Sequence, residues 1–295
     1  MIRPVVLVGA NGMLAHMVRQ LAPCGVRLHL LDLPEFDVTA HCQVSEELAR
    51  LNPAVIINCA AFTRVDACES EQDSAYAVNG KAPGYLAAAA YASNALLVHI
   101  STDFVFAGDK TVPYDEDDQP RPLSVYGKSK LAGEQAIAAS ALQRYYIVRT
   151  SWLYGPAGGN FVATMMRLAT ERDELGVVAD QVGTPTFSAD LAAVVWRLVE
   201  LETAAAAPTY GIYHYSNAGE CSWYDFTCAI VAQMRQRNLP CRAAVKPITS
   251  AEYPLPAPRP AYSVLSKDKI MTAAGIVVPA WQDSLAQYFD MNLET

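Results

Sequence analysis

Tyr126 and Lys130 are the residues whose types and spacing first suggest chemistry. They stand four residues apart in the stretch SVYGKSKLAGE, which opens an alanine-rich helical pattern. Residues four apart on a helix share one face, about 6 Å apart along its axis, so the phenol and the ammonium point the same way. At roughly 4 Å and an effective dielectric near 20, an ammonium favours a phenolate by about 4 kcal/mol, or about three pKa units before desolvation is subtracted. We therefore expect Lys130 to tune Tyr126 as a proton donor.

A glycine-rich turn near the amino terminus predicts dinucleotide binding. In VVLVGANGMLAHMV, Gly9 follows an apolar run, Gly12 comes three residues later, and Ala15 takes the place of a third small residue. Gly9 permits a tight turn, Gly12 lets the backbone approach a pyrophosphate, and Ala15 keeps helix and strand close. The amino end of the following helix adds amide donors and a partial positive charge. An ordinary glycine-rich turn is the alternative, which the position between a strand and a helix disfavours.

Asp32 ends the second apolar run, where a carboxylate can accept hydrogen bonds from an adenosine ribose. A loop acid without a ligand is the alternative. Asp37 and Val38, in EFDVTA, could flank the adenine. Because residues 33–35 offer no cation for a 2′-phosphate, we expect NADH to serve at least as well as NADPH.

A hydroxyl that could orient a substrate oxygen stands in HISTDFVF. Ser101 and Thr102 end an apolar run there, which places them at the carboxyl edge of a parallel strand, where ligands bind in open α/β sheets. A tuned phenol beside a nicotinamide is suited to protonating an oxygen as a hydride reaches the carbon. By itself a Tyr-x-x-x-Lys pair is common by chance, and a solvated helix pair would be the better interpretation. The glycine turn upstream favours catalysis.

Short apolar runs alternate with longer helical patterns through the first half of the chain. The runs are VVLVGA, RLHLLDL, AVIINCAA, ALLVHIST and YYIVRTSW. This alternation implies βαβ units and a parallel sheet covered on both faces. We predict an α/β protein with a Rossmann-type, doubly wound dinucleotide-binding domain over residues 1–150 and a smaller, mainly substrate-binding α/β domain over residues 151–295. Residues 176–215, which include SADLAAVVWRLVEL, are expected to return to the first domain.

The composition favours small-molecule partners. Of the 295 residues, 52% are hydrophobic and 18% are charged, as in a compact globular protein, and the net charge is −8. An acidic chain without a Lys/Arg cluster lacks the basic surface that would attract nucleic acid or an anionic membrane. No apolar run is long enough to predict a membrane span. The seven cysteines are scattered without a C-x-x-C pair, and no signal peptide is evident. We therefore expect a cytoplasmic protein with free thiols.

Several motifs together resemble the extended short-chain dehydrogenase/reductases. They are G-x-x-G-x-x-A, NCAAFTRVD, STDFVF, YGKSKLAGE, RTSWLYG, NFV and DQVGTPT. More narrowly, the chain is similar to the dTDP-4-dehydrorhamnose reductases, which reduce the 4-keto group of a dTDP-linked 6-deoxysugar with NADH or NADPH. The resemblance continues through GIYHYSNAGECSWYDF and PAPRPAYSVLS, and so covers nearly the whole chain. It implies a dTDP-sugar substrate and a place in nucleotide-sugar biosynthesis.

The resemblance implies roles for the residues that match the family motifs. The implied catalytic group is Thr102, Tyr126 and Lys130, with Lys130 also on the nicotinamide ribose. Further cofactor contacts are implied for Gly12, Met13, Leu14, Ala61, Phe62 and Thr63. Substrate contacts are implied for Thr102, Asp103, Trp152 and Arg259, the last because a guanidinium binds phosphate bidentately. A core tryptophan and a surface arginine are the alternatives. Asn79 matches an asparagine behind the site, with a helix-kinking structural role as an equal alternative.

One position departs from the family pattern. Some family members bind magnesium at a dimer interface through glutamates, one of them in the first helix where this chain has Met17. A thioether is a poor ligand for a hard cation. We therefore expect no metal, which puts a magnesium-linked homodimer in doubt and leaves a homodimer of another kind open.

Other functions remain as alternatives. Dehydratases of the superfamily carry a second acid where this chain has Phe104 after Asp103, so dehydration is disfavoured. Epimerases differ at the STDFVF strand end but are harder to exclude by a single residue. Another extended short-chain dehydrogenase/reductase acting on a nucleotide sugar therefore remains an alternative. The regulatory subunit of methionine adenosyltransferase resembles the same branch and works by binding a partner. The intact set of Thr102, Tyr126 and Lys130 favours chemistry.

Overall fold

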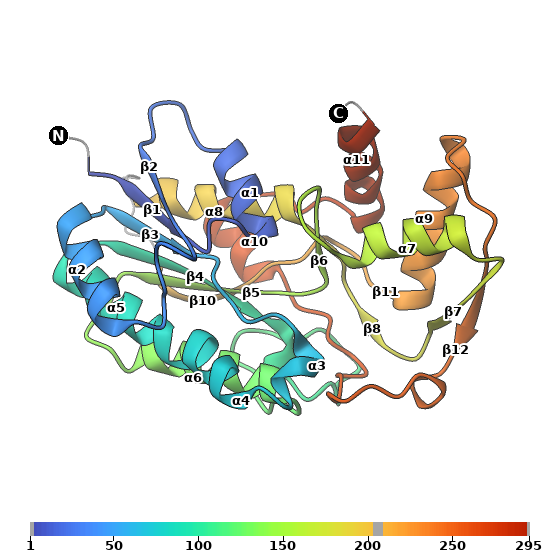
Figure 1. Ribbon diagram of the computed structural model, residues 1–295, viewed down its shortest axis with the longest axis horizontal. Helices are drawn as coiled ribbons and strands as arrows, with labels where there is room; N and C mark the ends of the chain where they lie inside the picture. The colour runs from blue at the N-terminus through green and yellow to red at the C-terminus, as the bar shows by residue number, and fades with distance from the viewer. Residues whose placement is uncertain (1–2, 203–208, 294–295) are drawn as a thin grey trace.

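A six-stranded parallel sheet forms the centre of the larger part of the molecule (Figure 1). The computed structural model describes residues 3–202 and 209–293. The strand order is β10-β5-β4-β3-β1-β2, and every pairing is parallel. In that order the strands are Gly211–His214, Tyr145–Thr150, Leu96–Thr102, Val55–Asn58, Val5–Val8 and Leu28–Leu31. Because all five apolar runs of the first half become strands of this sheet, the prediction of a Rossmann-type α/β fold is confirmed.

Apolar side chains cover both faces of the sheet. Along β1, Val5 and Leu7 belong to one buried cluster, whereas Val6 and Val8 belong to the other. Successive side chains of a strand point to opposite faces, so a strand buried on both sides has no solvent-facing position for polar residues. This is why the runs are continuously apolar rather than alternating.

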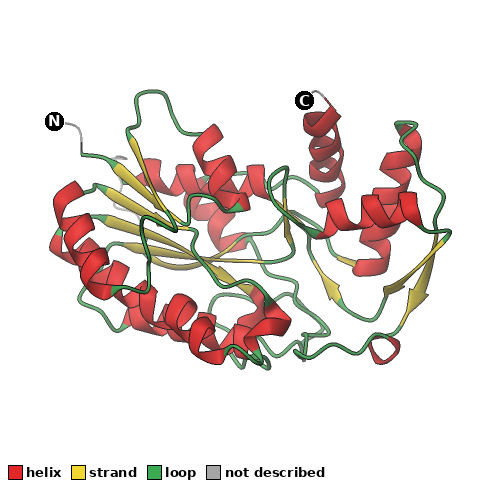
Figure 2. Cartoon of the chain, in the orientation of Figure 1, coloured by secondary structure: helices red, strands yellow, loops and turns green. Residues whose placement is uncertain are grey.

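A layer of helices lies on each side of the sheet (Figures 1 and 2). One layer contains α1 (Met13–Gln20), α8 (Ser188–Leu201) and α10 (Asp268–Ala274). The other contains α2 (His41–Leu51), α5 (Ala82–Ala92) and α6 (Val125–Ala138). No helix in the described part of the chain is long and apolar enough to cross a membrane.

Helix α8 and strand β10 (Gly211–His214) join the smaller region to the larger part of the molecule. Helix α8 packs on α1, where Trp196 Nε1 donates to the carbonyl of Val18 at 2.8 Å. Strand β10 then extends the sheet beside β5. Residues 203–208 belong to the segment predicted to return to the first domain, but they lie outside the described residues.

The smaller region lies beyond the carboxyl ends of the sheet strands (Figure 2). It pairs β7 (Glu174–Val178) with β12 (Ala244–Ile248) and packs α7 (Phe161–Glu171) and α9 (Trp223–Gln236) against this pair. Its other elements are β6 (Leu153–Tyr154), β8 (Val182–Gly183), β9 (Thr186–Phe187), β11 (Cys221–Ser222), η3 (Ser250–Glu252) and α11 (Trp281–Leu293).

The strand order determines where a ligand can bind. From β1 the chain crosses to β2 on one side and then returns to β3 on the other, so a crevice opens at the carboxyl ends of β1 and β3. Strand β4 continues into the short turn η2 (Asp103–Val105) near this crevice. Strand β3 is followed by α3 (Val65–Cys68), α4 (Gln72–Ala75) and the π-helix η1 (Tyr76–Lys81).

Candidate active site

The glycine turn packs against the end of a neighbouring strand. Gly9 has a φ of +75°, and a Cβ built on it would lie 2.5 Å from the backbone nitrogen of Ala60. Only glycine therefore fits this turn. Gly12 is the N-cap of α1, and the first turn has neither a side-chain cap nor an acidic residue. Because the first amides of a helix have no intrahelical acceptor, this end can bind a phosphate.

A cavity of about 290 Å³ extends from this turn along the strand ends. The predicted cofactor residues that line it are Gly9, Gly12, Asp32, Asp37, Val38, Ala61 and Phe62. Five other predicted cofactor residues do not line it: Met13 approaches Gly155, Leu14 is buried in the core, Thr63 is exposed, and Tyr126 and Lys130 lie outside its lining. The turn, the uncapped helix end and the groove together fit a dinucleotide.

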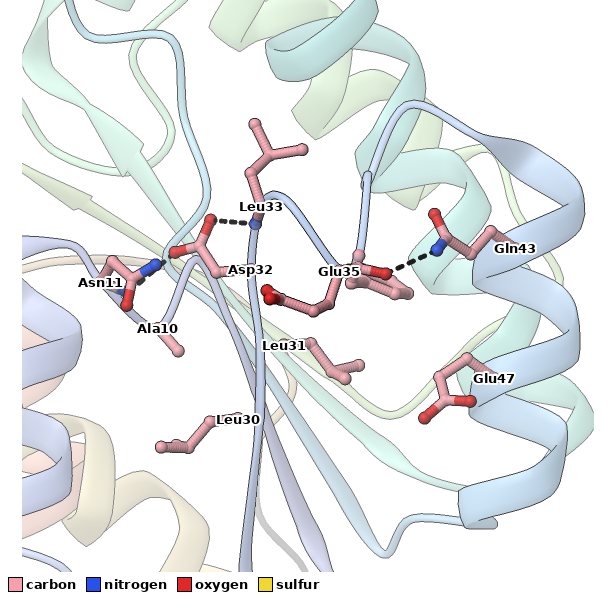
Figure 3. Close-up of a pocket in the computed structure, with 10 residues that line it drawn as sticks. Ala10, Asn11, Leu30, Leu31, Asp32, Leu33, Glu35, Gln43 and Glu47 are labelled. Carbon is pink, nitrogen blue, oxygen red and sulfur yellow. Dashed lines mark hydrogen bonds between the residues drawn. The ribbon is translucent and has the colours of Figure 1, made fainter.

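Asp32 lies between this groove and a second cavity of about 450 Å³ (Figure 3). Its Oδ2 accepts from the backbone nitrogen of Asn11 at 2.7 Å, and its Oδ1 accepts from that of Leu33 at 2.8 Å. The carboxylate is thus held in place and retains lone pairs for ribose hydroxyls. Glu35 and Glu47 also line the second cavity, and none of the described residues around either cavity is cationic.

A close approach of α6 to the end of β4 brings Thr102 and Tyr126 together. A Cβ on Gly127 would collide with the carbonyl oxygen of Phe104, so glycine is required for this approach. The rings of Phe104 and Tyr126 meet edge to face, with centroids 5.5 Å apart. The hydroxyl of Thr102 is close enough to Tyr126 to lower the pKa of its phenol. The two predicted catalytic hydroxyls are therefore neighbours.

Lys130 lies one helical turn beyond Tyr126 and is buried. Its Nζ donates to the carbonyl of Ile100 on β4 at 2.6 Å. Burial lowers the pKa of Lys130 to about 8, and the negative charge of Glu134 offsets part of that lowering. The ammonium is thus fixed to the strand that carries Thr102.

The protonation of Tyr126 differs from the expectation drawn from its spacing to Lys130. Burial raises the pKa of Tyr126 well above its ordinary value, and the hydroxyl of Thr102 lowers it only in part. Lys130 is not among the groups that shift it. The lowering expected from Lys130 is therefore wrong for this structure, where burial of the phenol dominates its pKa.

Ser101 points into a buried ion pair instead of the site. Its Oγ donates to Oε1 of Glu134 at 2.5 Å, and Nη2 of Arg149 lies 2.7 Å from Oε2 of Glu134. The side chains of Arg149 and Glu134 are 2% and 3% exposed. Because Glu134 lies one turn beyond Lys130 on α6, this pair fixes the catalytic helix to β4 and β5.

Asn79 has contacts that suit a structural role. It lies in η1, where its Oδ1 accepts from the backbone nitrogen of Phe62 at 2.8 Å. Its Nδ2 donates to the carbonyl of Phe62 and to Oγ of Ser129, both at 3.1 Å. Asn79 thus ties the backbone of a groove residue to α6.

A further cavity of about 450 Å³ lies between the strand ends and the smaller region. Trp152 and Arg259 line it together with many apolar side chains. The ring of Trp152 stacks on Trp223 with centroids 3.5 Å apart and an interplanar angle of 7°. Trp152 also has a φ of +45°, a strained conformation for a bulky residue that is found mainly at functional sites.

Asp103 is buried behind Thr102 and does not line this cavity. Its Oδ1 accepts from Oγ1 of Thr102 at 3.1 Å. Its Oδ2 has no hydrogen-bond partner among the described residues, although the nearby hydroxyl of Ser263 lowers the pKa of Asp103 in part. Burial dominates and raises the pKa of Asp103 to about 6. A contact between Asp103 and substrate stays a prediction.

The sequence patterns did not predict two residues of this region, Trp223 in the cavity lining and Asp66 beside Arg259. Trp223 stands in the motif GECSWYDF, and Asp66, which pairs with Arg259, stands in NCAAFTRVD. The only signals for them in the sequence were an aromatic residue in the first motif and an acidic residue in the second. Their partners could not be read from the motifs, because each partner is distant in the chain.

Comparison with known proteins finds relatives over the whole chain. Residues 3–293 match the family described as RmlD substrate binding domain. A dTDP-4-dehydrorhamnose reductase of Aggregatibacter actinomycetemcomitans is 44% identical over 287 residues, which cover 95% of this chain and 96% of the relative. A solved dTDP-4-dehydrorhamnose reductase from Clostridium acetobutylicum has a TM-score of 0.92 and 42% identity, and covers 99% of this chain and 100% of its own. One from Bacillus anthracis, in complex with NADP, has a TM-score of 0.91 and 38% identity over 100% of both chains.

Proposed function

This chain belongs to the RmlD substrate binding domain family, and from that membership we propose that it is an NAD(P)H-dependent oxidoreductase acting on a nucleotide sugar. The reaction is the reduction of the 4-keto group of dTDP-4-dehydro-6-deoxy-L-mannose to dTDP-L-rhamnose. One observation carries the catalytic assignment: Tyr126 has neighbours in the linings of both the coenzyme groove and the Trp152 cavity. Phe104, in contact with its ring, lines the cavity of Trp152, and Phe62, which packs on the same buried cluster as Tyr126, lines the groove.

The residues around the groove would hold the coenzyme. Gly9, Gly12 and the first turn of α1 would bind the diphosphate, and Asp32 would bind the adenosine ribose. When bound, NAD(P)H supplies the hydride that C4 of the sugar accepts. The flat Trp152 ring and the Arg259 cation suit a sugar diphosphate in the adjoining cavity.

Tyr126 is the proposed proton donor. Its phenolic proton goes to the 4-oxygen, so that the carbonyl gains a hydride at carbon and a proton at oxygen and becomes an alcohol. Thr102 orients that oxygen through its hydroxyl. Lys130, whose Nζ is held by the carbonyl of Ile100, would bind the nicotinamide ribose and so place the coenzyme near Tyr126. The cytoplasmic location and a homodimer stay predictions.

Oxidation of NADH by the 4-keto sugar tests this function. The substrate is generated from dTDP-glucose with a dehydratase and an epimerase, and the nicotinamide absorbance is followed with NADH and with NADPH. We expect oxidation, and we expect Tyr126→Phe to lower kcat by about 100-fold or more without changing NADH affinity.

Two results would redirect the proposal. If both coenzymes stay unoxidised while a known reductase consumes them in the same mixture, a non-catalytic role like that of the methionine adenosyltransferase regulatory subunit takes its place. Oxidation with a 4-keto sugar on another nucleotide alone would indicate another extended reductase.

A further inference from the structure

Arg259 is held by a carboxylate from the opposite part of the molecule. Asp66 lies on α3, after β3, whereas Arg259 lies in the proline-rich loop that follows η3. Nη1 of Arg259 donates to Oδ1 of Asp66 at 3.0 Å, and Nη2 donates to Oδ2 at 2.8 Å. The side chains of Arg259 and Asp66 are 19% and 38% exposed. The pair is therefore partly shielded from water.

The backbone around Arg259 is anchored on both sides. Before it, the buried Ala257 donates its backbone N–H to Oδ1 of Asp66 at 3.1 Å. After it, the segment 261–263 makes two backbone hydrogen bonds to Val182 of β8, both of 2.8 Å. The position of the Arg259 backbone is thus set by α3 and by β8.

One edge of the guanidinium remains free. Nη1 also donates to the carbonyl of Ala257 at 2.7 Å, so the known bonds occupy Nη1 and one N–H of Nη2. Nε and the second N–H of Nη2 have no acceptor among the described residues. These two N–H groups are parallel on the planar guanidinium and match two oxygens of a phosphate. Arg259 lines the cavity of Trp152, so a diphosphate bound there can meet this edge.

We propose that Asp66 is a positioning residue for the diphosphate of the nucleotide sugar, because it holds one edge of Arg259 and leaves the Nε–Nη2 edge for the ligand. The inference rests on the proposed function, since it takes the cavity's ligand to be a nucleoside diphosphate sugar. Asp66 acts through Arg259 and has no part in proton or hydride transfer.

Two effects of Asp66 oppose each other. Its negative charge repels a diphosphate. Its hydrogen bonds to Arg259, however, already restrict the rotamers of that side chain, so less conformational entropy is lost when the ligand binds. The repulsion is weak, because the carboxylate is paired with a guanidinium and is 38% exposed to screening solvent. A long unpaired side chain loses much rotamer entropy when a ligand fixes it. Orientation therefore outweighs repulsion.

Calorimetric titration of the full chain with dTDP tests this role. We expect Asp66→Asn to weaken dTDP binding about tenfold and to leave thymidine, which lacks phosphates, unaffected. Arg259→Lys keeps the positive charge but loses the paired N–H donors of the guanidinium, and should weaken dTDP binding by a similar factor. The matched control is Asp73→Asn on α4, an exposed acid whose carboxylate has no partner among the described residues; its dTDP affinity should equal that of wild type.

A double-mutant cycle separates positioning from a general structural role. In the Arg259→Gln background, Asp66→Asn should cause no further loss of dTDP affinity. In turnover, Asp66→Asn should raise KM for the sugar nucleotide with little change in kcat. NADH affinity should stay at the wild-type value throughout.

Three outcomes overturn the inference: unchanged or tighter dTDP binding by Asp66→Asn, an equal loss for thymidine, or the same loss in the Arg259→Gln background. If wild type fails to bind dTDP at all, both the inference and the proposed substrate fail. If Asp66→Asn reduces the dTDP-sugar with the KM and kcat of wild type, the role of Asp66 is overturned while the proposed function stands.

Discussion

The charge states of Tyr126 and Lys130 are decided by burial. Burial raises the pKa of Tyr126 and lowers that of Lys130 to about 8, because desolvation penalises the charged form of each. Glu134, whose negative charge raises the pKa of Lys130 in part, is also paired with Arg149. The remaining neighbours stay uncharged near neutral pH: burial raises the pKa of Cys59 to about 12 and lowers that of His99 well below its ordinary value. Lys130 is thus the group near the site that should titrate at mildly alkaline pH.

We expect kcat/KM for the sugar to fall as the pH rises through about 8. Lys130 carries its proton below that pH and loses it above, whereas Tyr126 keeps its own. On the acid side, Asp103 loses its charge as the pH falls through about 6. The plateau of kcat/KM should therefore lie between about pH 6 and about pH 8. The measurement is kcat/KM at saturating NADH over about pH 5.5 to 9.5.

Lys130→Arg serves as the control for this profile. A guanidinium does not deprotonate in this range, so any remaining activity should lack the alkaline fall. A variant that keeps the fall would show that another group causes it.

The element that bears on coenzyme choice is the loop between β2 and α2. Gln43 of α2 fixes this loop, because its Nε2 donates to the carbonyl of Glu35 at 2.8 Å and its Oε1 accepts from the backbone nitrogen of Asp37 at 2.9 Å. The carboxylates of Asp32 and Glu35 then stand at the same cavity, with Glu47 across from them on α2 (Figure 3). A 2′-phosphate on a ribose held by Asp32 would meet negative charge.

NADH should therefore serve at least as well as NADPH. Leu33, which is 61% exposed beside Asp32, offers a way to reverse this preference. We expect Leu33→Arg to raise kcat/KM for NADPH about tenfold, because a guanidinium there can pair with the 2′-phosphate. Leu33→Gln, which adds polarity without charge, should leave the ratio of the two coenzymes unchanged. A wild-type preference for NADPH above about tenfold would contradict the expectation and point to His16 or Arg19 as the phosphate contact.

At the scale of the whole molecule, Met17 bears on metal and assembly. Its side chain is 1% exposed and packs in the core cluster that also contains α8 residues. The Met17 side chain is therefore used in core packing. Within residues 3–202 and 209–293, no three His, Cys, Asp or Glu side chains are grouped so that they could hold a metal ion.

Removal of divalent metals should change neither turnover nor assembly. We expect EDTA to leave kcat and the mass from light scattering unaltered, because the chain has a buried thioether where a magnesium ligand would stand. Magnesium added back is the control. A reversible change in mass or rate would mean that other acidic residues bind the metal.

Local patterns in the sequence were sufficient to predict the strands, the glycine turn and the shared helix face of Tyr126 and Lys130. Such features depend on residues a few positions apart, through side-chain periodicity and turn conformation. Even the need for glycine at position 9 follows from its place between a strand and a helix.

The tertiary structure alone decided which distant groups meet and how strongly they are buried. Arg259 and Asp66 are 193 positions apart, and Trp152, in the bend between β5 and β6, stacks on Trp223 of α9. The sequence showed an ammonium near Tyr126 but not the desolvation that raises the pKa of the phenol. Pairing and desolvation depend on chain segments that only folding brings together, so no local pattern contains them.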